Sequence, residues 1–351
     1  MPVQLSGACQ MGAETEWLRS VGTDDLFSVI GEPQTGPFLS PEAAGRPPRG
    51  DGVLADAAPQ AVKAAPVETH AGMTVIAAFR GIALACLDHL QSNEQGLQQS
   101  DHPEFVHQAR VAIRRLRSAI RVWRARLPPE FVARFDPVWQ ALARHLGETR
   151  NWDVFVAETL PAIAAAFSEG VEIACLADYA RRRGAIHRQA ARSALHSDAY
   201  SRMLLEFTAA VLVLPDRAAC PLDVFAPRCL DKRARQVSEL AAQAVDSDAA
   251  ARHRLRVAYK RLRYALEFFA PLFPSERLRH YHLAASRLQE MLGQLNDLAV
   301  AVELSSEALS GEQGEVVRCW LAGQTERLLP ELGELLSDFR EQAVPWRLPA
   351  G

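Results

Sequence analysis

The chain has 351 residues, 48% of them hydrophobic and 23% charged, with a formal net charge of -3 at pH 7. These values fit a globular protein of one or two domains. No stretch approaches the roughly 18 uninterrupted apolar residues of a membrane-spanning helix, and the N-terminus lacks the basic start and apolar run of a secretory signal. We therefore expect a cytoplasmic protein with no membrane-spanning segment.

Residues 1–68 are rich in Pro, Gly and Ala and show no sustained hydrophobic period. This composition predicts a disordered tail. From residue 69 to about residue 340 the pattern changes to long amphipathic segments with few glycines, separated by short breaks, which predicts an all-α domain. The predicted helices are 72–98, 103–126, 129–147, 150–168, 172–195, 198–213, 222–245, 249–270, 275–292, 295–309 and 312–338.

An internal repeat organises this domain. The segment "HQARVAIRRLRSAI" from His107 aligns with "HRLRVAYKRLRYAL" from His253, 146 residues later. The same offset places "LGETRNWDV" from Leu146 on "LGQLNDLAV" from Leu292. Two motifs in one register predict a duplicated helical unit, with a first half at about 69–213 and a second half at about 222–340.

Both copies of the first motif place basic residues along one side of a helix, beside an apolar side. The apolar side of the first copy consists of Ala112, Ile113, Leu116, Ala119, Ile120 and Trp123, and its basic side of His107, Arg110, Arg114, Arg117, Arg121 and Arg124. The apolar side of the second copy consists of Leu255, Ala258, Tyr259, Leu262, Ala265, Leu266 and Phe269, and its basic side of Arg252, His253, Arg256, Lys260 and Arg263. We call the two basic sides the basic stripes. Glu267 stands where the first copy has Arg121, which shortens the second stripe.

A charged helix face is usually a solvated one, but these stripes differ from an ordinary surface. Like charges three or four residues apart each cost about 0.2 to 0.5 kcal/mol, so the first stripe costs on the order of 1 to 2 kcal/mol. A solvated face would alternate its signs, and neither stripe contains an acid. The repulsion is explained if a polyanion binds there, or if the stripe faces acids elsewhere in the fold. Three of the 39 basic residues are lysine, and arginine is the better bidentate partner for phosphate.

The residues that follow the two Leu-Gly pairs are interpreted as turn and cap formers, because a glycine ends helices well and short polar side chains start them. They are Arg150, Asn151, Asp153, Asn296 and Asp297. Further basic residues that could extend the binding surface are Arg80, Arg181, Arg188, Arg192, Lys232 and Arg235, besides Arg124 and Arg252 of the stripes. The six cysteines form no C-x-x-C pair, and neither His107 nor His253 has a metal-ligating residue four positions later. We expect neither a metal nor a cofactor.

Together the paired motifs resemble those of the CHAD family, the conserved-histidine α-helical domain. The resemblance implies an all-α fold of two pseudo-symmetric four-helix units, a helical bundle with a central basic groove or pore. It also implies binding of inorganic polyphosphate and association with polyphosphate granules; phosphate or sulfate would occupy the same site in crystals. Carried over by position, the polyphosphate-binding residues are His107, Arg110, Arg114, Arg117, Arg121, His253, Arg256, Lys260 and Arg263.

Two other functions fit a basic helix face: nucleic-acid binding and docking of an acidic protein. Few aromatic residues flank the stripes, which counts against stacking on single-stranded bases. For catalysis the sequence offers no Walker A loop, no H-E-x-x-H and no G-x-S-x-G. We therefore expect a protein that binds polyphosphate and is not an enzyme.

Overall fold

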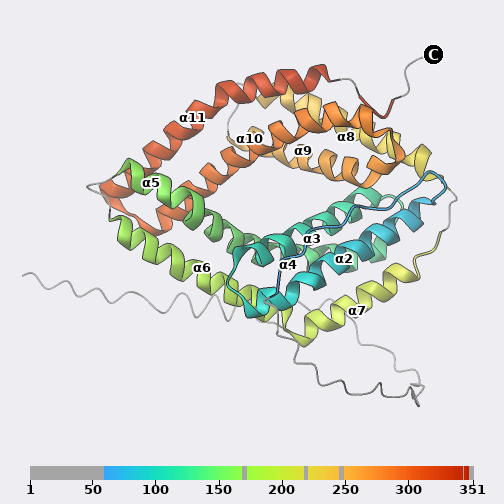
Figure 1. Cartoon of the computed structure of the whole chain (residues 1–351), viewed down its shortest axis with the longest axis horizontal. Coiled ribbons are helices and arrows are strands. Elements are labelled where there is room, and N and C mark those ends of the chain that lie inside the picture. The colour runs from blue at the N-terminus through green and yellow to red at the C-terminus, as the bar shows by residue number, and fades with distance from the viewer. Residues whose placement is uncertain (1–58, 168–171, 217–219, 245–248, 343, 348–351) are drawn as a thin grey trace, which may run out of the picture. The chain divides into compact units, whose positions relative to one another are not determined.

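The computed structural model describes residues 59–167, 172–216, 220–244, 249–342 and 344–347. This part of the chain consists of helices joined by short connections (Figure 1), and its one β-type pairing is an isolated bridge between Thr74 and Pro221. The predicted all-α class is confirmed. Among these residues, no helix is both long and apolar enough to cross a membrane. Of the predicted tail, residues 1–58 lie outside the described residues.

The helices follow one another in two groups. The first comprises α2 (Val75–Gln99), α3 (Pro103–Trp123), α4 (Pro129–Val154), a π-helical turn (Phe155–Thr159), α5 (Leu160–Ala166), α6 (Ile173–Leu195) and α7 (Asp198–Leu212). The second comprises α8 (Leu222–Ala244), α9 (Ala249–Phe269), a 3-10 turn (Ala270–Leu272), α10 (Ser275–Ala308) and α11 (Gly311–Glu341). In Figure 1, α8 to α11 gather on one side and α2, α3, α4 and α7 on the other.

Side chains at the helix starts explain several of these bounds. The Thr74 hydroxyl accepts a hydrogen bond from the Ala77 amide at 3.1 Å, and the Ser197 hydroxyl accepts one from the Tyr200 amide at 3.1 Å. Pro103 opens α3, where its missing N–H would have no helical partner. Each feature satisfies or removes an amide that the first helical turn leaves unpaired.

The 146-residue offset recurs in the helix bounds. Helix α3 begins at Pro103 and α9 at Ala249, and α4 begins at Pro129 and α10 at Ser275. Both pairs of starting points are therefore 146 residues apart, as in the sequence alignment. The duplication itself stays a prediction, and the bounds agree with its register.

One aromatic cluster joins the two groups of helices. Trp123, at the end of α3, is fully buried, and its indole N–H donates to the Val75 carbonyl at 2.7 Å. Its ring lies 5.8 Å from that of Phe225 on α8 and 5.2 Å from that of Phe269 on α9. Because one buried indole contacts three neighbouring helices, it fixes how α3 and α9 approach each other.

A second apolar cluster joins the groups elsewhere. It combines Trp152 and Ile163 from α4 and α5 with Leu304 and Val317 from α10 and α11. Helices of the first group are therefore packed on helices of the second group at two separate places. This packing fixes the position of α3, with the first basic stripe, relative to α9, with the second.

Residues 60–69 differ from the predicted tail, because they pack against the helices without regular secondary structure of their own. The Val62 carbonyl accepts a hydrogen bond from Asn93 at 2.9 Å, and the Ala65 carbonyl accepts one from Arg115 at 3.3 Å. The Thr69 hydroxyl donates to the Phe268 carbonyl at 3.0 Å. Residues 60–69 therefore pack with the helical domain, whereas their composition placed them in the tail.

Gly96 sets the spacing between α2 and α3. A Cβ at this position would lie 2.0 Å from the Phe105 ring, whereas a Cβ at Gly81 of the same helix would meet nothing within 4 Å. We expect Gly96→Ala to lower the free energy of unfolding by about 1 to 3 kcal/mol, because the buried Phe105 ring has to move. Gly81→Ala is the control and will raise it by up to about 1 kcal/mol. Urea unfolding measures both, and equal effects would contradict this packing.

Candidate functional site

The two basic stripes meet where α3 contacts α9. Arg110 and Arg114 of α3 lie close enough to Arg256 and Lys260 of α9 for their charges to interact across the contact. All four side chains are partly buried. We call these four residues the inner cluster. Sequence periodicity predicted each stripe, and the structure brings the two together.

Burial and mutual repulsion weaken the charged form of these groups. Burial, followed by Arg114, lowers the pKa of Arg110 to about 10 and that of Arg256 to about 10. The largest effect is on Lys260, where burial and then the guanidinium groups of Arg114, Arg256 and Arg110 lower the pKa to about 5. Asp297 is the acid that opposes this shift. The inner cluster therefore holds positive charge that its nearest neighbours do not neutralise.

The two histidines of the motifs occupy different surroundings. His107 is partly buried, and burial followed by the nearby Arg150 lowers its pKa. Its Nδ1 is buried without a hydrogen-bond partner. His253, near the start of α9, is exposed. His107 lies beside the inner cluster, since Arg110 and Arg114 also act on it.

Further along α3, the first stripe meets an acid that the sequence could not place. Asp136 of α4 lies 3.5 Å from Arg117 and 3.9 Å from Arg124, and Arg117 also donates to the Gln140 side chain at 3.0 Å. Arg121 is exposed on the same stripe. Part of the predicted repulsion is thus offset within the fold, at Arg117 and Arg124, while the inner cluster keeps its excess charge.

Tyr264 connects the stripes and was not among the predicted site residues. The Arg263 guanidinium lies 4.2 Å from the centre of its ring, and that of Arg114 lies 6.0 Å away. Both distances are within the range of cation–π attraction. The buried ring therefore supports one arginine from each stripe, and its position directly after Arg263 was the signal available in the sequence.

The predicted turns after the two Leu-Gly pairs are wrong. Helix α4 runs through Gly147, and α10 runs through Gly293 without a break. Arg150, Asn151, Asp153, Asn296 and Asp297 therefore lie inside helices and cap nothing.

The physical reason is that α4 and α10 remain packed across these positions, so the helical hydrogen bonds continue. Gly147 faces the inner cluster, because a Cβ there would lie 3.8 Å from the Arg110 Nε. Arg150 and Asp297 act on the site electrostatically, Arg150 on His107 and Asp297 on Lys260. These two are functional candidates that the turn interpretation missed.

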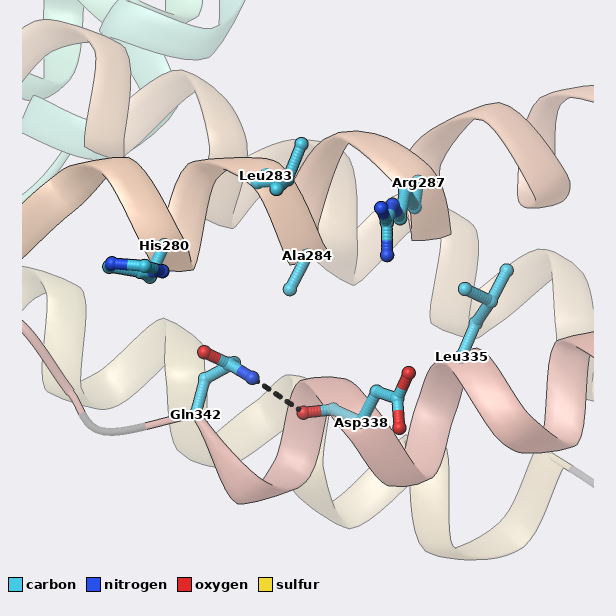
Figure 2. A pocket seen from close by; sticks show the side chains of 7 residues that line it. All are labelled: His280, Leu283, Ala284, Arg287, Leu335, Asp338 and Gln342. Atoms are coloured by element: carbon cyan, nitrogen blue, oxygen red, sulfur yellow. Dashed lines mark hydrogen bonds between the residues drawn. The ribbon is translucent and has the colours of Figure 1, made fainter.

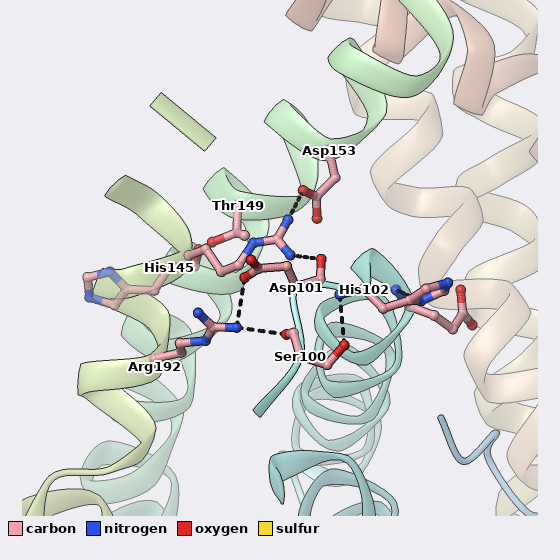
Figure 3. Close-up of polar contacts among 9 residues, drawn as sticks. Ser100, Asp101, His102, His145, Thr149, Asp153 and Arg192 are labelled. Carbon is pink, nitrogen blue, oxygen red and sulfur yellow. Dashed lines mark hydrogen bonds and ion pairs between the residues drawn. The ribbon is translucent and has the colours of Figure 1, made fainter. Parts of the chain in front are cut away.

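Two of the additional arginines, Arg188 and Arg192 on α6, form a polar network with the end of α2 (Figure 3). Arg192 donates to the Ser100 carbonyl at 2.7 Å and pairs with Asp101 at 3.0 Å. Arg188 pairs with Asp153 and donates to the Asp101 carbonyl. These contacts satisfy carbonyls beyond a helix C-terminus, which gives both arginines a structural role.

The other additional residues are dispersed. Arg80 donates to two backbone carbonyls at the end of α7, at 3.2 and 3.1 Å. Arg181 is exposed on α6 and pairs with Asp178 at 2.6 Å. Lys232 and Arg235 are exposed on α8, and Arg252 is partly buried near the start of α9. Their part in binding stays a prediction.

A small pocket of about 150 Å³ lies between α10 and α11 (Figure 2) and shares no residue with either stripe. It is lined by His280, Leu283, Ala284, Arg287, Leu335, Asp338 and Gln342. Within the described residues, no group of three or more His, Cys, Asp or Glu side chains is placed to hold a metal ion.

Comparison with known proteins places this arrangement in a family. The model of the CHAD domain matches residues 81–305, which is more than half of the chain. The chain belongs to the CHAD family. The crystal structure of the CHAD domain from the plant Ricinus communis is similar to this CHAD domain, with 32% sequence identity and a TM-score of 0.73 over 82% of this chain and 98% of that one.

A second solved structure, PptA from Streptomyces chartreusis, is similar in fold, with 14% identity and a TM-score of 0.56. The similarity covers 77% of this chain and 99% of PptA. Among curated proteins, none matches significantly.

Proposed function

We propose that this CHAD domain binds inorganic polyphosphate and does not cleave it. The observation that carries the proposal is the inner cluster, in which four basic side chains from two helices are held together with little compensating acid. Such an arrangement costs folding free energy through repulsion and burial. Binding a polyanion would offset both terms, because phosphate oxygens accept hydrogen bonds from the guanidinium groups while neutralising them.

Polyphosphate fits the arrangement better than a ligand with specific bases. It is a flexible line of closely spaced charges, so its binding requires cations along a track. The track here runs along α3 for about 21 Å from His107 to Arg121, at about 1.5 Å per residue. Bound in this way, the protein would collect on polyphosphate granules in the cytoplasm, which fluorescence co-localisation with a polyphosphate stain would test.

Nucleic-acid binding is the alternative with the next best support, since a basic helix face attracts any phosphate backbone. Binding of single strands usually adds aromatic stacking on exposed bases. Tyr264, the aromatic residue at the site, is buried and already covered by Arg263. This favours a ligand without bases. Docking of an acidic protein is the third possibility.

Calorimetric titration with long-chain polyphosphate at about 0.15 M salt tests the proposal. We expect a sub-micromolar dissociation constant. The logarithm of the binding constant should fall steeply and linearly with the logarithm of the salt concentration, because binding releases counterions. A short single-stranded RNA at equal phosphate concentration should not displace polyphosphate. Orthophosphate release on prolonged incubation should stay at the level of a protein-free control. Displacement by RNA would favour the nucleic-acid alternative, and absence of binding to both polymers would favour an acidic protein.

A further inference from the structure

A buried ion pair crosses the contact between α3 and α9. The Arg115 Nε lies 2.6 Å from the Glu267 Oε1, and the Arg115 side chain is 2% exposed. Glu267 also lies 3.7 Å from Arg263. The acid that shortens the second stripe, Glu267, is therefore the partner of a buried arginine on the other helix.

The 146-residue register gives this pair a counterpart. It relates Arg115 to Arg261 and Arg121 to Glu267. In this register, the positions of Arg115 and Glu267 in one half correspond to those of Arg261 and Arg121 in the other half. One side of the helix crossing has an arginine and a carboxylate, and the equivalent side has two arginines.

A third arginine, Arg233, lies near Arg121 and Arg261. Arg233 of α8 is held by its own helix, because its Nη1 donates to the Cys229 carbonyl at 3.0 Å. Burial, and then the charges of Arg121 and Arg233, lower the pKa of Arg261. Within the described part of the chain, no carboxylate lies within ion-pair distance of these three side chains. We call Arg121, Arg233 and Arg261 the outer trio.

We infer that the outer trio is a second oxyanion site, at which a phosphate group of the ligand takes the place that the Glu267 carboxylate has at the equivalent position. The inference rests on the proposed function. The trio lies apart from the inner cluster: Arg121 follows Arg114 by two helical turns, about 10 Å along α3. A long polyphosphate chain can reach both sites, whereas triphosphate bound at the inner cluster is too short to do so. The outer trio therefore selects for long chains.

The structure suggests an informative variant, Arg121→Glu, which recreates at the outer trio the pair that Arg115 and Glu267 form. We expect its affinity for long-chain polyphosphate to fall by about tenfold or more, since a lost charged hydrogen bond commonly has that effect. Its affinity for triphosphate should fall by much less than that for long chains, because triphosphate at the inner cluster does not reach Arg121, about 10 Å away along α3, and salt at 0.15 M screens part of the interaction over that distance. Its melting temperature should not fall, because the substitution replaces a repulsive contact by an attractive one.

The matched control is Arg202→Glu, which makes the same charge change at an exposed arginine near the start of α7. It should change neither affinity. Arg261→Gln, which keeps the helix and removes one member of the trio, should reproduce the selective loss of long-chain affinity. Equal losses for long chains and triphosphate, or no loss for either, would overturn the second site. Failure of the wild-type protein to bind either ligand would instead overturn the proposed function, and the inference with it.

Discussion

Replacing Arg114, Arg256 and Lys260 together by glutamine will lower the affinity for long-chain polyphosphate by at least about a hundredfold, because each removed cation forfeits a charge-assisted contact worth about a factor of ten. The same variant should be at least as stable as the wild type. Burial and like charges lower the pKa of both Arg256 and Lys260, so their charged forms are less favourable in the folded protein than in the unfolded chain. Calorimetry and thermal unfolding measure the two effects.

The opposite directions of the two effects make this test specific. A substitution that merely damaged the fold would lower the affinity and the melting temperature together. The matched control replaces Arg202, Arg327 and Arg340 by glutamine, which removes the same number of basic side chains from exposed positions of α7 and α11. It should leave the affinity within about threefold, since screened charges at a distance contribute little. Retained binding in the cluster variant, or equal loss in the control, would show that net charge and not the inner cluster holds the ligand.

The sequence was sufficient for the helical class and for the stripes, because both follow from periodicity within one helix. Arg110 and Arg114 fall on one face of α3 for the same reason that Ile113 and Leu116 fall on its buried face. That Lys260 would lie beside Arg114 could not be read from periodicity. It depends on how α3 and α9 cross, which aromatic packing around Trp123 determines.

The errors arose where local preferences were opposed by packing. Gly147 and Gly293 suggested helix ends, yet both helices continue, because neighbouring turns stay packed. Glycine at position 147 instead leaves room beside Arg110. The ion pair of Arg115 and Glu267 could not be predicted either, because the two residues lie on different helices and helical periodicity relates only residues of one helix.

The packing of residues 60–69 against the helices was missed for a related reason. Its Pro- and Ala-rich composition has no hydrophobic period, and its order comes from single contacts, such as the hydrogen bond from Arg115 to the Ala65 carbonyl at 3.3 Å. Such contacts depend on the finished helical surface. The composition of a segment indicates whether it can fold by itself, but not which surface of the folded domain it will pack against.

Binding of polyphosphate at neutral pH will be accompanied by proton uptake, because Lys260 is largely neutral in the free protein. Burial and Arg114 lower its pKa to about 5, and a bound polyanion raises the pKa of any amine that it contacts. Above pH 5 the complex therefore holds more protons than the free protein, and the affinity falls as pH rises, by up to about tenfold per pH unit for one proton. Below about pH 5 the amine is protonated in both states, and its contribution to the pH dependence disappears. The lowered pKa of His107 acts in the same direction.

Titrations at pH 7 in two buffers with different ionisation enthalpies measure this uptake directly, and we expect on the order of one proton per inner cluster. Lys260→Met should remove most of the uptake, while His107→Asn should remove a smaller part. Between pH 5 and the ordinary lysine pKa of 10.5, the folded protein binds fewer protons at Lys260 than the unfolded chain does. The free energy of unfolding therefore rises with pH in this range, and the destabilisation caused by burying Lys260 disappears near pH 10.5. Lys260→Met should therefore raise the melting temperature at pH 7 by more than it does at pH 10. A buffer-independent binding enthalpy would mean that Lys260 is already charged in the free protein, and that the inner cluster tolerates four cations without giving up a proton.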